Sequence, residues 1–350
     1  QAAMTGTDVN DINFFTSDLL MPVTTQLCVN SEEMLTHLSG VAKALMSLAK
    51  GDDLAWRQIL TNVVPMAADQ TIAMQLSNAD KAIVMVGALA NNHPEAAKIR
   101  ALSALISRLT SSQLVILPTA NSKASLIAGT MPQSEQALNA AQSWEAKLQA
   151  YVLLGVEPEL DCANSQAAIT ALKQANCVVS LSSYVTDAML AYADVILPVA
   201  SFAESSGTFV SIDGQWQAYT GAVTAKGDSR PAWKVLRVLA NLVELDGFEY
   251  VSSQDVSDEI RHLTDNKKNT SSASYCPDSL KSTSSGIQMI SEVPMYQTDS
   301  VVRRSSALAH TPENQAALIA KMNASEAKKW GVSSADTITV KRDQQTVTLA

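Results

Sequence analysis

Short and nearly continuous apolar runs recur through the middle of the chain, separated by stretches with helical spacing. Five of these runs have the length of a β-strand: 81–87, 113–118, 150–155, 177–181 and 193–198. Continuous rather than alternating hydrophobicity is typical of strands that are buried on both faces of a parallel sheet. We therefore expect these segments to form five parallel strands.

Helical patterns fill much of the space between these runs. They cover four segments: 93–109, 134–149, 164–175 and 230–245. Pro94 suits a first helical position, and Ser134 and Asn164 are N-cap candidates. This alternation predicts a doubly wound α/β fold, with a mostly parallel sheet and helices on both faces.

The composition changes after about residue 262. Segment 265–286 contains seven serines, two threonines and little that can pack, which is typical of a linker or a long surface loop. We expect an α/β domain over 1–264, a Ser-rich linker or loop over 265–299, and a C-terminal segment over 300–350. The tail alternates like a β-hairpin that turns at 342–345, so we expect a short C-terminal β segment that either begins a small β domain or packs on the main domain.

Charge and length narrow the class of protein. Hydrophobic residues make up 47% of the 350 residues, charged residues make up 17%, and the formal net charge is -9. A substantial core is therefore expected, whereas nucleic acid and anionic membrane surfaces are disfavoured as partners. The apolar runs are far shorter than the roughly 20 residues that span a bilayer. Gln1 stands where an initiator methionine is usual, which suggests part of a longer polypeptide.

Known catalytic and metal-binding patterns are missing from the sequence. The four cysteines have no CxxC spacing, and the four histidines form no HxxxH motif. A zinc ribbon or an iron–sulfur cluster is therefore not expected. GxSxG is also absent, so we expect neither a catalytic residue nor a metal ligand in this chain.

The segment 193–217, "ADVILPVASFAESSGTFVSIDGQWQ", looks like the wall of a ligand site. An apolar strand ends at Pro198, and Glu204 and the closely spaced Gly207 and Gly214 follow. Ligands of doubly wound sheets bind at the carboxyl ends of the strands. The motif therefore raises the question of whether a ligand still binds there.

This motif belongs to a longer pattern that also includes 151–161 and 227–243. Together these segments resemble the molybdopterin oxidoreductase superfamily. Within it, the closer resemblance is to one component of bacterial NADH-quinone oxidoreductase, respiratory complex I, which we call the molybdopterin-like subunit of that complex. It is carried by "VGALANNHPEAAKIRAL", "NSKASLIAG" and "SVVRRSSALAHT" (86–102, 121–129 and 300–311). The resemblance covers roughly residues 20–350, with the Ser-rich segment unmatched.

The resemblance implies a non-catalytic scaffold in the peripheral arm of that complex, which passes electrons from NADH to quinone. The iron–sulfur clusters of the molybdopterin-like subunit lie in an N-terminal cysteine-rich region, and this chain would be the C-terminal region. The implied partners are the other subunits of the peripheral arm. The implied location is peripheral, on the cytoplasmic side of the inner membrane, without direct membrane insertion and without nucleic acid.

The resemblance also suggests where a cofactor would bind. In members that bind molybdopterin guanine dinucleotide, this sheet edge holds the nucleotide half. The corresponding candidates here, which we interpret as vestigial, are Gly155, Glu157, Ser180, Glu204 and Gly207.

Several polar positions depart from the superfamily pattern. Ser205 replaces a common lysine, and 213–215 reads Asp-Gly-Gln in place of Glu-Gly-Arg. Because phosphate groups need cationic or N–H donors, we expect no molybdenum cofactor in this chain. Glu204 then accepts hydrogen bonds from its own loop, and Asp194 acts as a local cap.

Two functions stay open from the sequence. One is the scaffold. The alternative is a fragment of a molybdenum- or tungsten-dependent oxidoreductase that binds a pterin guanine dinucleotide. An unrelated nucleotide-binding protein is disfavoured because GxGxxG and GxxxxGK[ST] are absent.

Arg303 and Arg304 stand between apolar neighbours in an acidic chain and are candidate interaction residues. In one interpretation they are solvated or neutralised by nearby carboxylates. In the other, at least one guanidinium is a bidentate anchor. Such an anchor would tie the C-terminal segment to the α/β domain or contact a neighbouring subunit.

Overall fold

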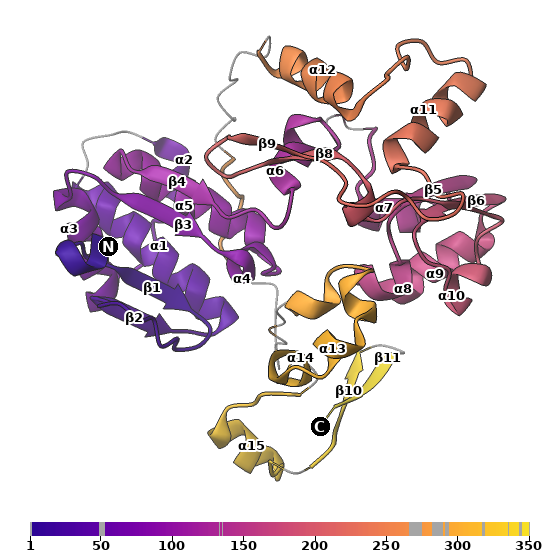
Figure 1. The fold of residues 1–350 in the computed structure, drawn as a ribbon. Coiled ribbons are helices and arrows are strands. Elements are labelled where there is room, and N and C mark those ends of the chain that lie inside the picture. The colour runs from indigo at the N-terminus through magenta and orange to yellow at the C-terminus, as the bar shows by residue number, and fades with distance from the viewer. Residues whose placement is uncertain are drawn as a thin grey trace. The chain divides into compact units, whose positions relative to one another are not determined.

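The computed structural model describes residues 2–48, 53–132, 134, 136–265, 275–281, 290, 294–316, 319–334, 336–342 and 345–349. They belong to two compact units, which are described separately (Figure 1). Unit 1 comprises Gln1–Ser122 and Lys267–Glu292, and unit 2 comprises Lys123–Asn266 and Val293–Ala350.

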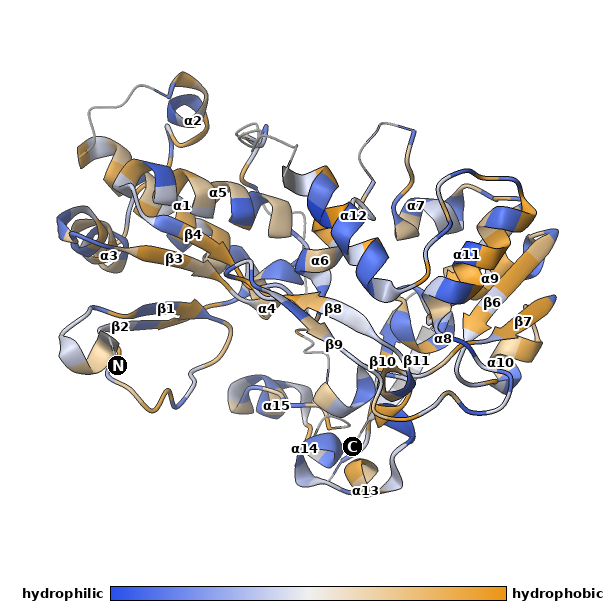
Figure 2. Cartoon of the chain, turned by 45° about the horizontal axis from the view of Figure 1, so that its top comes forward, coloured by the Kyte–Doolittle hydropathy of each residue, from blue (hydrophilic) through white to orange (hydrophobic). Residues whose placement is uncertain are grey.

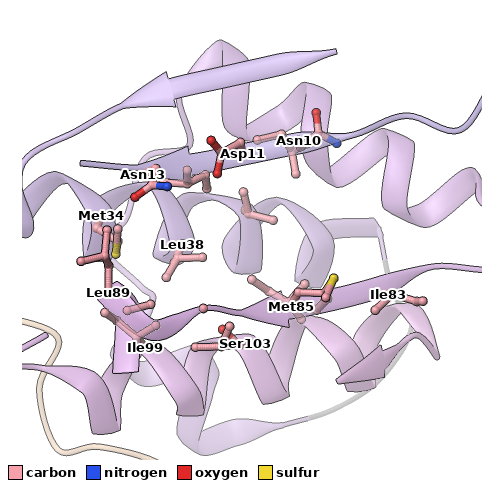
Figure 3. Close-up of a pocket in the computed structure, with 18 of the residues that line it drawn as sticks. Asn10, Asp11, Asn13, Met34, Leu38, Ile83, Met85, Leu89, Ile99 and Ser103 are labelled. Atoms are coloured by element: carbon pink, nitrogen blue, oxygen red, sulfur yellow. The ribbon is translucent and has the colours of Figure 1, made fainter. Parts of the chain in front are cut away.

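Unit 1 combines short parallel strands with three longer helices. Its elements are η1 (Ala2–Thr5), β1 (Asn10–Asn13), β2 (Thr25–Cys28), α1 (Ser31–Leu48), α2 (Leu54–Ile59), α3 (Ala67–Asn78), β3 (Ile83–Val86), α4 (Ala88–Asn91), α5 (Ala96–Thr110) and β4 (Gln113–Ile116). Strand β1 pairs in parallel with β2, and β3 pairs in parallel with β4. Figure 2 shows the apolar character of β3 and β4. A cavity of about 590 Å³ lies between β1 and β3 (Figure 3).

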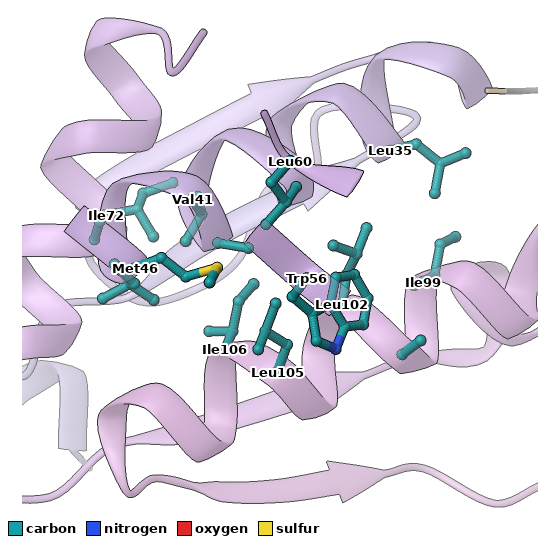
Figure 4. Packing of buried hydrophobic residues seen from close by; sticks show 14 of the residues in the cluster. Leu35, Val41, Met46, Trp56, Leu60, Ile72, Ile99, Leu102, Leu105 and Ile106 are labelled. Carbon is teal, nitrogen blue, oxygen red and sulfur yellow. The ribbon is translucent and has the colours of Figure 1, made fainter. Parts of the chain in front are cut away.

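Helices α1, α2, α3 and α5 enclose the core of unit 1 (Figure 4). Trp56 of α2 and Leu60, which directly follows α2, pack with Leu102 and Leu105 of α5. All four side chains are almost fully buried. Burying such a side chain stabilises the fold by roughly 1.5–3 kcal/mol. Helix α5 ends where Ser111 adopts a left-handed conformation with φ of 53°, a usual form of helix C-cap.

Helices α1 and α3 approach closely at Gly40. A Cβ atom on Gly40 would lie 2.7 Å from Cγ of Asp69, a side chain that is fully buried in α3. Asp69 accepts hydrogen bonds from Met66 N at 2.9 Å and from His37 Nδ1 at 2.7 Å. The missing side chain at Gly40 therefore lets α3 place a buried carboxylate against α1.

Unit 2 begins with a mixed α/β region. Its elements up to residue 265 are α6 (Ser122–Ile127, which starts at the boundary), α7 (Ala140–Glu145), β5 (Ala150–Leu154), α8 (Pro158–Asp161), α9 (Ser165–Gln174), β6 (Cys177–Ser182), α10 (Asp187–Leu190), β7 (Val195–Pro198), η2 (Phe202–Glu204), β8 (Gly207–Val210), β9 (Trp216–Tyr219), α11 (Ala232–Leu242) and α12 (Ser253–Asp265). Strands β5, β6 and β7 form a parallel sheet in that order, and β8 and β9 form an antiparallel hairpin.

One face of the β5–β6–β7 sheet is packed. Tyr151 and Leu153 of β5 are buried with Leu172 of α9 and with Met189 of α10. Burial along β5 alternates, and Val152 on the other face is 57% exposed. The continuous apolar run of β5 is therefore covered on one side only within the described chain.

The C-terminal part of unit 2 consists of short elements. They are η3 (Met295–Gln297), η4 (Val302–Arg304), α13 (Ser306–Ala309), α14 (Pro312–Ala316), α15 (Ala324–Trp330), β10 (Ile338–Arg342) and β11 (Gln345–Leu349). Strands β10 and β11 pair antiparallel, with Arg342 opposite Gln345. The predicted hairpin pairing is therefore confirmed, and residues 343–344 of its turn lie outside the described residues. Among the described residues, no helix is long and apolar enough to cross a membrane.

The predicted α/β class, with parallel sheets flanked by helices, is confirmed, but the sheet is divided. All five predicted strands form. They belong to two sheets, one of two strands and one of three, and no pairing joins the two groups in the described residues. The division after Ser122 lies inside the predicted 1–264 domain, so the boundaries at 265 and 300 stay predictions. Residues 266–274, 282–289 and 291–293 of the predicted linker lie outside the described residues.

Two of the predicted helix starts are wrong. Helix α7 begins after Asn139, which caps Gln142 N, and not at Ser134. Pro94 precedes the cap of α5, which is Glu95. Asn164 caps α9 as predicted, accepting a hydrogen bond from Ala167 N at 3.1 Å.

Candidate functional site

The candidate site lies at the carboxyl end of β5, where the chain turns into α8. Gly155 ends the strand with a φ of +61°, a conformation that favours glycine, and its N–H donates to Leu181 O at 2.8 Å. Two residues later Glu157 is the N-cap of α8. The turn at Gly155 therefore brings the Glu157 carboxylate to the sheet edge, and that side chain is only 2% exposed.

Arg303, from the C-terminal segment, forms a fork onto two carboxylates of this turn. Its Nη1 donates to Glu157 Oε2 at 3.3 Å, and its Nη2 donates to Asp161 Oδ1 at 2.6 Å. The Arg303 side chain is 7% exposed. Asp161 also accepts a hydrogen bond from Glu157 N at 2.7 Å, so the two carboxylates are held in one local frame.

Arg304 contacts the same glutamate from another direction. Its Nη2 lies 2.8 Å from Glu157 Oε1, which is close enough for an ion pair although the angle gives no aligned hydrogen bond. Its guanidinium carbon lies 4.4 Å from the ring centre of Tyr184, in a cation–π contact. Two positive charges therefore surround one buried carboxylate, and Asp161 supplies a second negative charge.

Hydrogen bonds of the residues just before Arg303 and Arg304 fix the conformation of this segment. Asp299 Oδ1 accepts hydrogen bonds from Val301 N at 2.8 Å and from Val302 N at 3.1 Å. The Asp299 carbonyl accepts from Arg303 N at 2.9 Å, and Arg304 Nη1 donates to Ser300 O at 2.8 Å. An aspartate turn and η4 thus fix both arginines on the same short segment.

The other acidic residue of α8 bonds to hydroxyl groups. Glu159 accepts from Thr186 Oγ1 at 3.0 Å and from Tyr192 Oη at 3.3 Å. Burial, followed by the charge of Glu159, raises the pKa of the Tyr192 phenol. Burial, followed by the charges of Asp161 and Glu159, raises the pKa of the neighbouring Cys162 thiol. Both groups therefore stay protonated at neutral pH, and Cys162 lacks the thiolate that a nucleophile needs.

Glu204 caps its own loop. Its Oε2 accepts from Ser201 N at 2.9 Å and from Ser201 Oγ at 3.1 Å, and its Oε1 accepts from Lys226 N at 3.2 Å. The hydrogen bond from Ser201 N is the largest cause that lowers the pKa of Glu204. The predicted local role of this carboxylate agrees with these contacts.

Packing and turn geometry account for two further motif positions. A Cβ atom on Gly207 would lie 2.8 Å from Tyr219 Oη across the β8–β9 hairpin. Asp194 Oδ2 accepts from Val178 N at 2.7 Å, next to the start of the β6–β7 pairing. Ser180 is fully buried in β6, and its hydroxyl has no hydrogen-bond partner in the described part of the chain. Ser180 is the one candidate for which we find no structural role.

Four of the five candidates thus form two separate groups. Gly155 and Glu157 belong to the site with Arg303 and Arg304. Glu204 and Gly207 belong to the loop and hairpin after β7, and no hydrogen bond or ion pair among the described residues joins them to Glu157. The sequence did not identify Asp161 or Tyr184 as site residues. The spacing of Glu157 and Asp161, four residues apart, was the available signal for one shared helix face.

A buried serine–histidine contact in unit 1 was also not predicted. His93 Nε2 contacts Ser31 Oγ and lies 3.1 Å from Ser31 O, whereas Nδ1 accepts from Glu95 N at 2.8 Å. This network assigns the ring proton to Nε2, so that nitrogen has no lone pair with which to deprotonate Ser31. The contact is therefore structural. In the described residues no group of three His, Cys, Asp or Glu side chains is placed to bind a metal ion.

Comparison with known proteins identifies the family. Residues 55–242 match the family model of molybdopterin oxidoreductase, which is more than half of the chain. The chain therefore belongs to the molybdopterin oxidoreductase family. The matched range crosses the boundary between the two units and ends with α11.

Curated relatives match over a shorter stretch. A protein of Staphylococcus aureus strain MRSA252, named "Putative formate dehydrogenase", is 37% identical over 73 residues, which are 21% of this chain and 7% of that protein. Proteins of the same name from strains USA300 and NCTC 8325 are 36% identical over 73 residues, with the same shares. The match therefore spans only 7% of the length of these relatives.

Proposed function

We propose that this chain is the C-terminal, molybdopterin oxidoreductase-like region of the molybdopterin-like subunit of NADH-quinone oxidoreductase, and that it is a non-catalytic scaffold in the peripheral arm. In this proposal the electrons pass from NADH to quinone through iron–sulfur clusters held outside the chain. Its partners are the other subunits of the arm, on the cytoplasmic side of the inner membrane.

The observation that carries the proposal is the pairing of Glu157 with Arg303 and Arg304. Arg303 and Arg304 belong to the segment that carries the most specific resemblance to the molybdopterin-like subunit. Their guanidiniums bind carboxylates of the same chain at the sheet edge where other family members hold a dinucleotide. A cationic group that is already paired with a buried carboxylate is not available for phosphate.

The remaining donors at this edge support the same proposal. Glu204 and Asp194 accept main-chain hydrogen bonds, and Tyr219 accounts for the absence of a side chain at Gly207. Among the candidates, Ser180 Oγ and Glu157 Oε1 are buried without a hydrogen-bond partner in the described chain. Glu157 Oε1 is ion-paired with Arg304, and the neutral hydroxyl of Ser180 is a weak match for a phosphate dianion. These residues do not fit an anionic pterin dinucleotide, so we derive no chemical step through one.

The name of the curated relatives favours a second candidate function. A molybdenum- or tungsten-dependent oxidoreductase would bind a pterin guanine dinucleotide at Gly155, Glu157, Ser180, Glu204 and Gly207. In that case the Arg303–Glu157 contact would have to open. The two candidates therefore differ in whether this ion pair persists in the working protein.

The experiment replaces both arginines by alanine in the full-length protein. We expect less assembled NADH-quinone oxidoreductase on native gels, with NADH oxidation per assembled complex near the wild-type value, because no electron carrier is touched. The matched control is Lys328→Ala with Lys329→Ala, which removes the same charge from an adjacent pair on the exposed helix α15. Normal assembly with reduced turnover would contradict the scaffold.

A further inference from the structure

A short part of the predicted linker packs on unit 1. It comprises residues 275–281, which we call the clip segment. Cys276 and Leu280 pack against the hydrophobic core of unit 1, and Pro277 between them is buried. The other residues of the segment are exposed. The chain therefore returns to unit 1 after α12, and three side chains anchor it there.

Polar contacts mark the two ends of the clip segment. Lys98 Nζ of α5 donates a hydrogen bond to Lys281 O at 2.7 Å. At the other end, burial, followed by the charge of Asp53, raises the pKa of the Cys276 thiol, and the charge of Arg108 opposes that shift. Cys276 therefore lies near the ion pair of Arg108 with Asp53.

These contacts give the clip segment its direction. Lys98 and Arg108 are ten residues apart on α5, which is about 15 Å along a helix. Cys276 and Lys281 are five residues apart, which is about 17 Å in an extended chain. The segment therefore lies extended along α5 and runs antiparallel to that helix.

Opening of the clip segment leaves the charged groups of α5 paired. Lys98 Nζ also lies 2.9 Å from Glu95 Oε2, so its charge keeps a partner when Lys281 moves away. Arg108 likewise keeps its ion pair with Asp53. Within the described residues, the contact with Lys98 is the one hydrogen bond that joins the main chain of the segment to another element. Parts of a fold with so few contacts open locally before the whole fold does.

We propose that residues 275–281 are a reversible clip, which docks along α5 and is released without unfolding of unit 1. The docked form holds the connection between α12 and η3 on unit 1, and the released form leaves it attached only through the chain. The surface along α5 is thus the binding site of a linear motif. Apolar side chains at 276, 277 and 280 meet the core, and the carbonyl at 281 meets Lys98. The proposal does not depend on which oxidoreductase the chain belongs to.

Thiol labelling of the whole chain tests the clip. N-ethylmaleimide reacts faster with Cys276 when the clip is released, and mass spectrometry measures the rate at each cysteine. In the native chain, Cys276 should react roughly tenfold more slowly than in the urea-unfolded chain, because the docked form predominates. Below the unfolding transition this rate should change little with urea, because release exposes little surface.

A substitution within the clip segment leaves the helices and strands of unit 1 untouched. Leu280→Ser removes an apolar anchor, so the labelling rate of Cys276 should rise roughly tenfold. The rate at Cys162, which is half-buried in unit 2, should not change. The matched control is Leu126→Ser, which replaces an exposed leucine of α6 and should alter neither rate.

A peptide in solution tests whether the surface along α5 binds a linear motif. The probe is the acetylated and amidated heptapeptide of residues 275–281 with Cys276→Ser. At about 1 mM it should displace the clip and raise the labelling rate of Cys276 several-fold, because a tethered segment has an effective concentration of the same order. The same peptide with Leu280→Ser as well should have no effect.

Each readout has an outcome that contradicts the proposal. Labelling of Cys276 in the native chain as fast as in the unfolded chain would mean that the segment is not docked. A rate that rises with urea as steeply as global unfolding would mean that the segment is a fixed part of unit 1. If Leu280→Ser does not fold, the urea and peptide measurements on the unaltered chain decide. Unchanged labelling in folded Leu280→Ser, or with the peptide present, would overturn the clip.

Discussion

Glu157 and Arg303 are 146 residues apart in the sequence and meet in unit 2 with 3.3 Å between Oε2 and Nη1. Both side chains are more than nine-tenths buried. A buried ion pair is weak evidence for net stability, because desolvation opposes the attraction. Removal of Arg303, however, leaves the buried Glu157 with only the partly exposed Arg304 and takes the cation away from Asp161.

The first prediction follows from that asymmetry. Arg303→Ala should lower the free energy of unfolding by about 3 kcal/mol, because Glu157 loses its buried partner. Arg304→Ala should cost only about 1 kcal/mol, because that side chain is 29% exposed and water can replace it. Urea unfolding followed by circular dichroism measures both. The control is Lys329→Ala, whose ion pair with Glu326 is exposed, and equal losses for Arg303→Ala and this control would contradict the account.

The second prediction concerns the contact between Arg304 and Tyr184. Tyr184→Leu should lower the free energy of unfolding by about 0.5–1 kcal/mol more than Tyr184→Phe, because phenylalanine keeps an aromatic face under the guanidinium. Repeating both substitutions in Arg304→Ala isolates the pairwise contribution. If the difference between leucine and phenylalanine survives without the arginine, then the contact with Arg304 is not its cause.

The third prediction concerns the close approach of α1 and α3. Gly40→Ala should lower the free energy of unfolding by about 1–3 kcal/mol, because the new methyl group collides with Asp69. Ser47→Ala in the same helix is exposed and should be neutral or slightly stabilising. Equal stability of the two variants would show that α3 can shift at low cost.

The fourth prediction concerns pH. Burial lowers the pKa of His93 in the folded chain, so the unfolded chain binds that proton more tightly. The stability that depends on neutral His93 is therefore complete above about pH 6.5 and is lost as the pH falls through the lower folded-state pKa. The free energy of unfolding should thus fall more steeply below about pH 6.5 in the wild type than in His93→Gln. Parallel curves for the two proteins would exclude this contribution.

The strands and the fold class were predictable because apolar runs and helical periodicity are local signals. The runs 81–87 and 150–155 contain strands β3 and β5. The division into two sheets was not predictable, because a continuous apolar run does not say which strand lies beside it. Met85 and Val152 are exposed although they are apolar like their buried neighbours along the strand. Their exposure depends on what covers the sheet.

The candidate site was predictable only in part. The sequence pointed to Glu157 through the family resemblance and to Arg303 through its charge in an apolar context. It gave no signal that the two meet, because a contact over 146 residues has no local periodicity. Asp161 and Tyr184 were missed for the same reason, since each gains its role only when η4 packs beside α8.

The central claim is that Arg303 and Arg304 pair with carboxylates of the same chain at the sheet edge where other family members bind a dinucleotide. The most direct measurement is the molybdenum, tungsten and pterin content of the full-length protein in its native assembly. Metal is determined by mass spectrometry, and pterin is determined by the fluorescence released on denaturation. The account predicts iron from clusters outside this chain, with molybdenum, tungsten and pterin far below one per chain. A value near one pterin and one molybdenum or tungsten per chain would contradict the account and establish the cofactor-binding alternative.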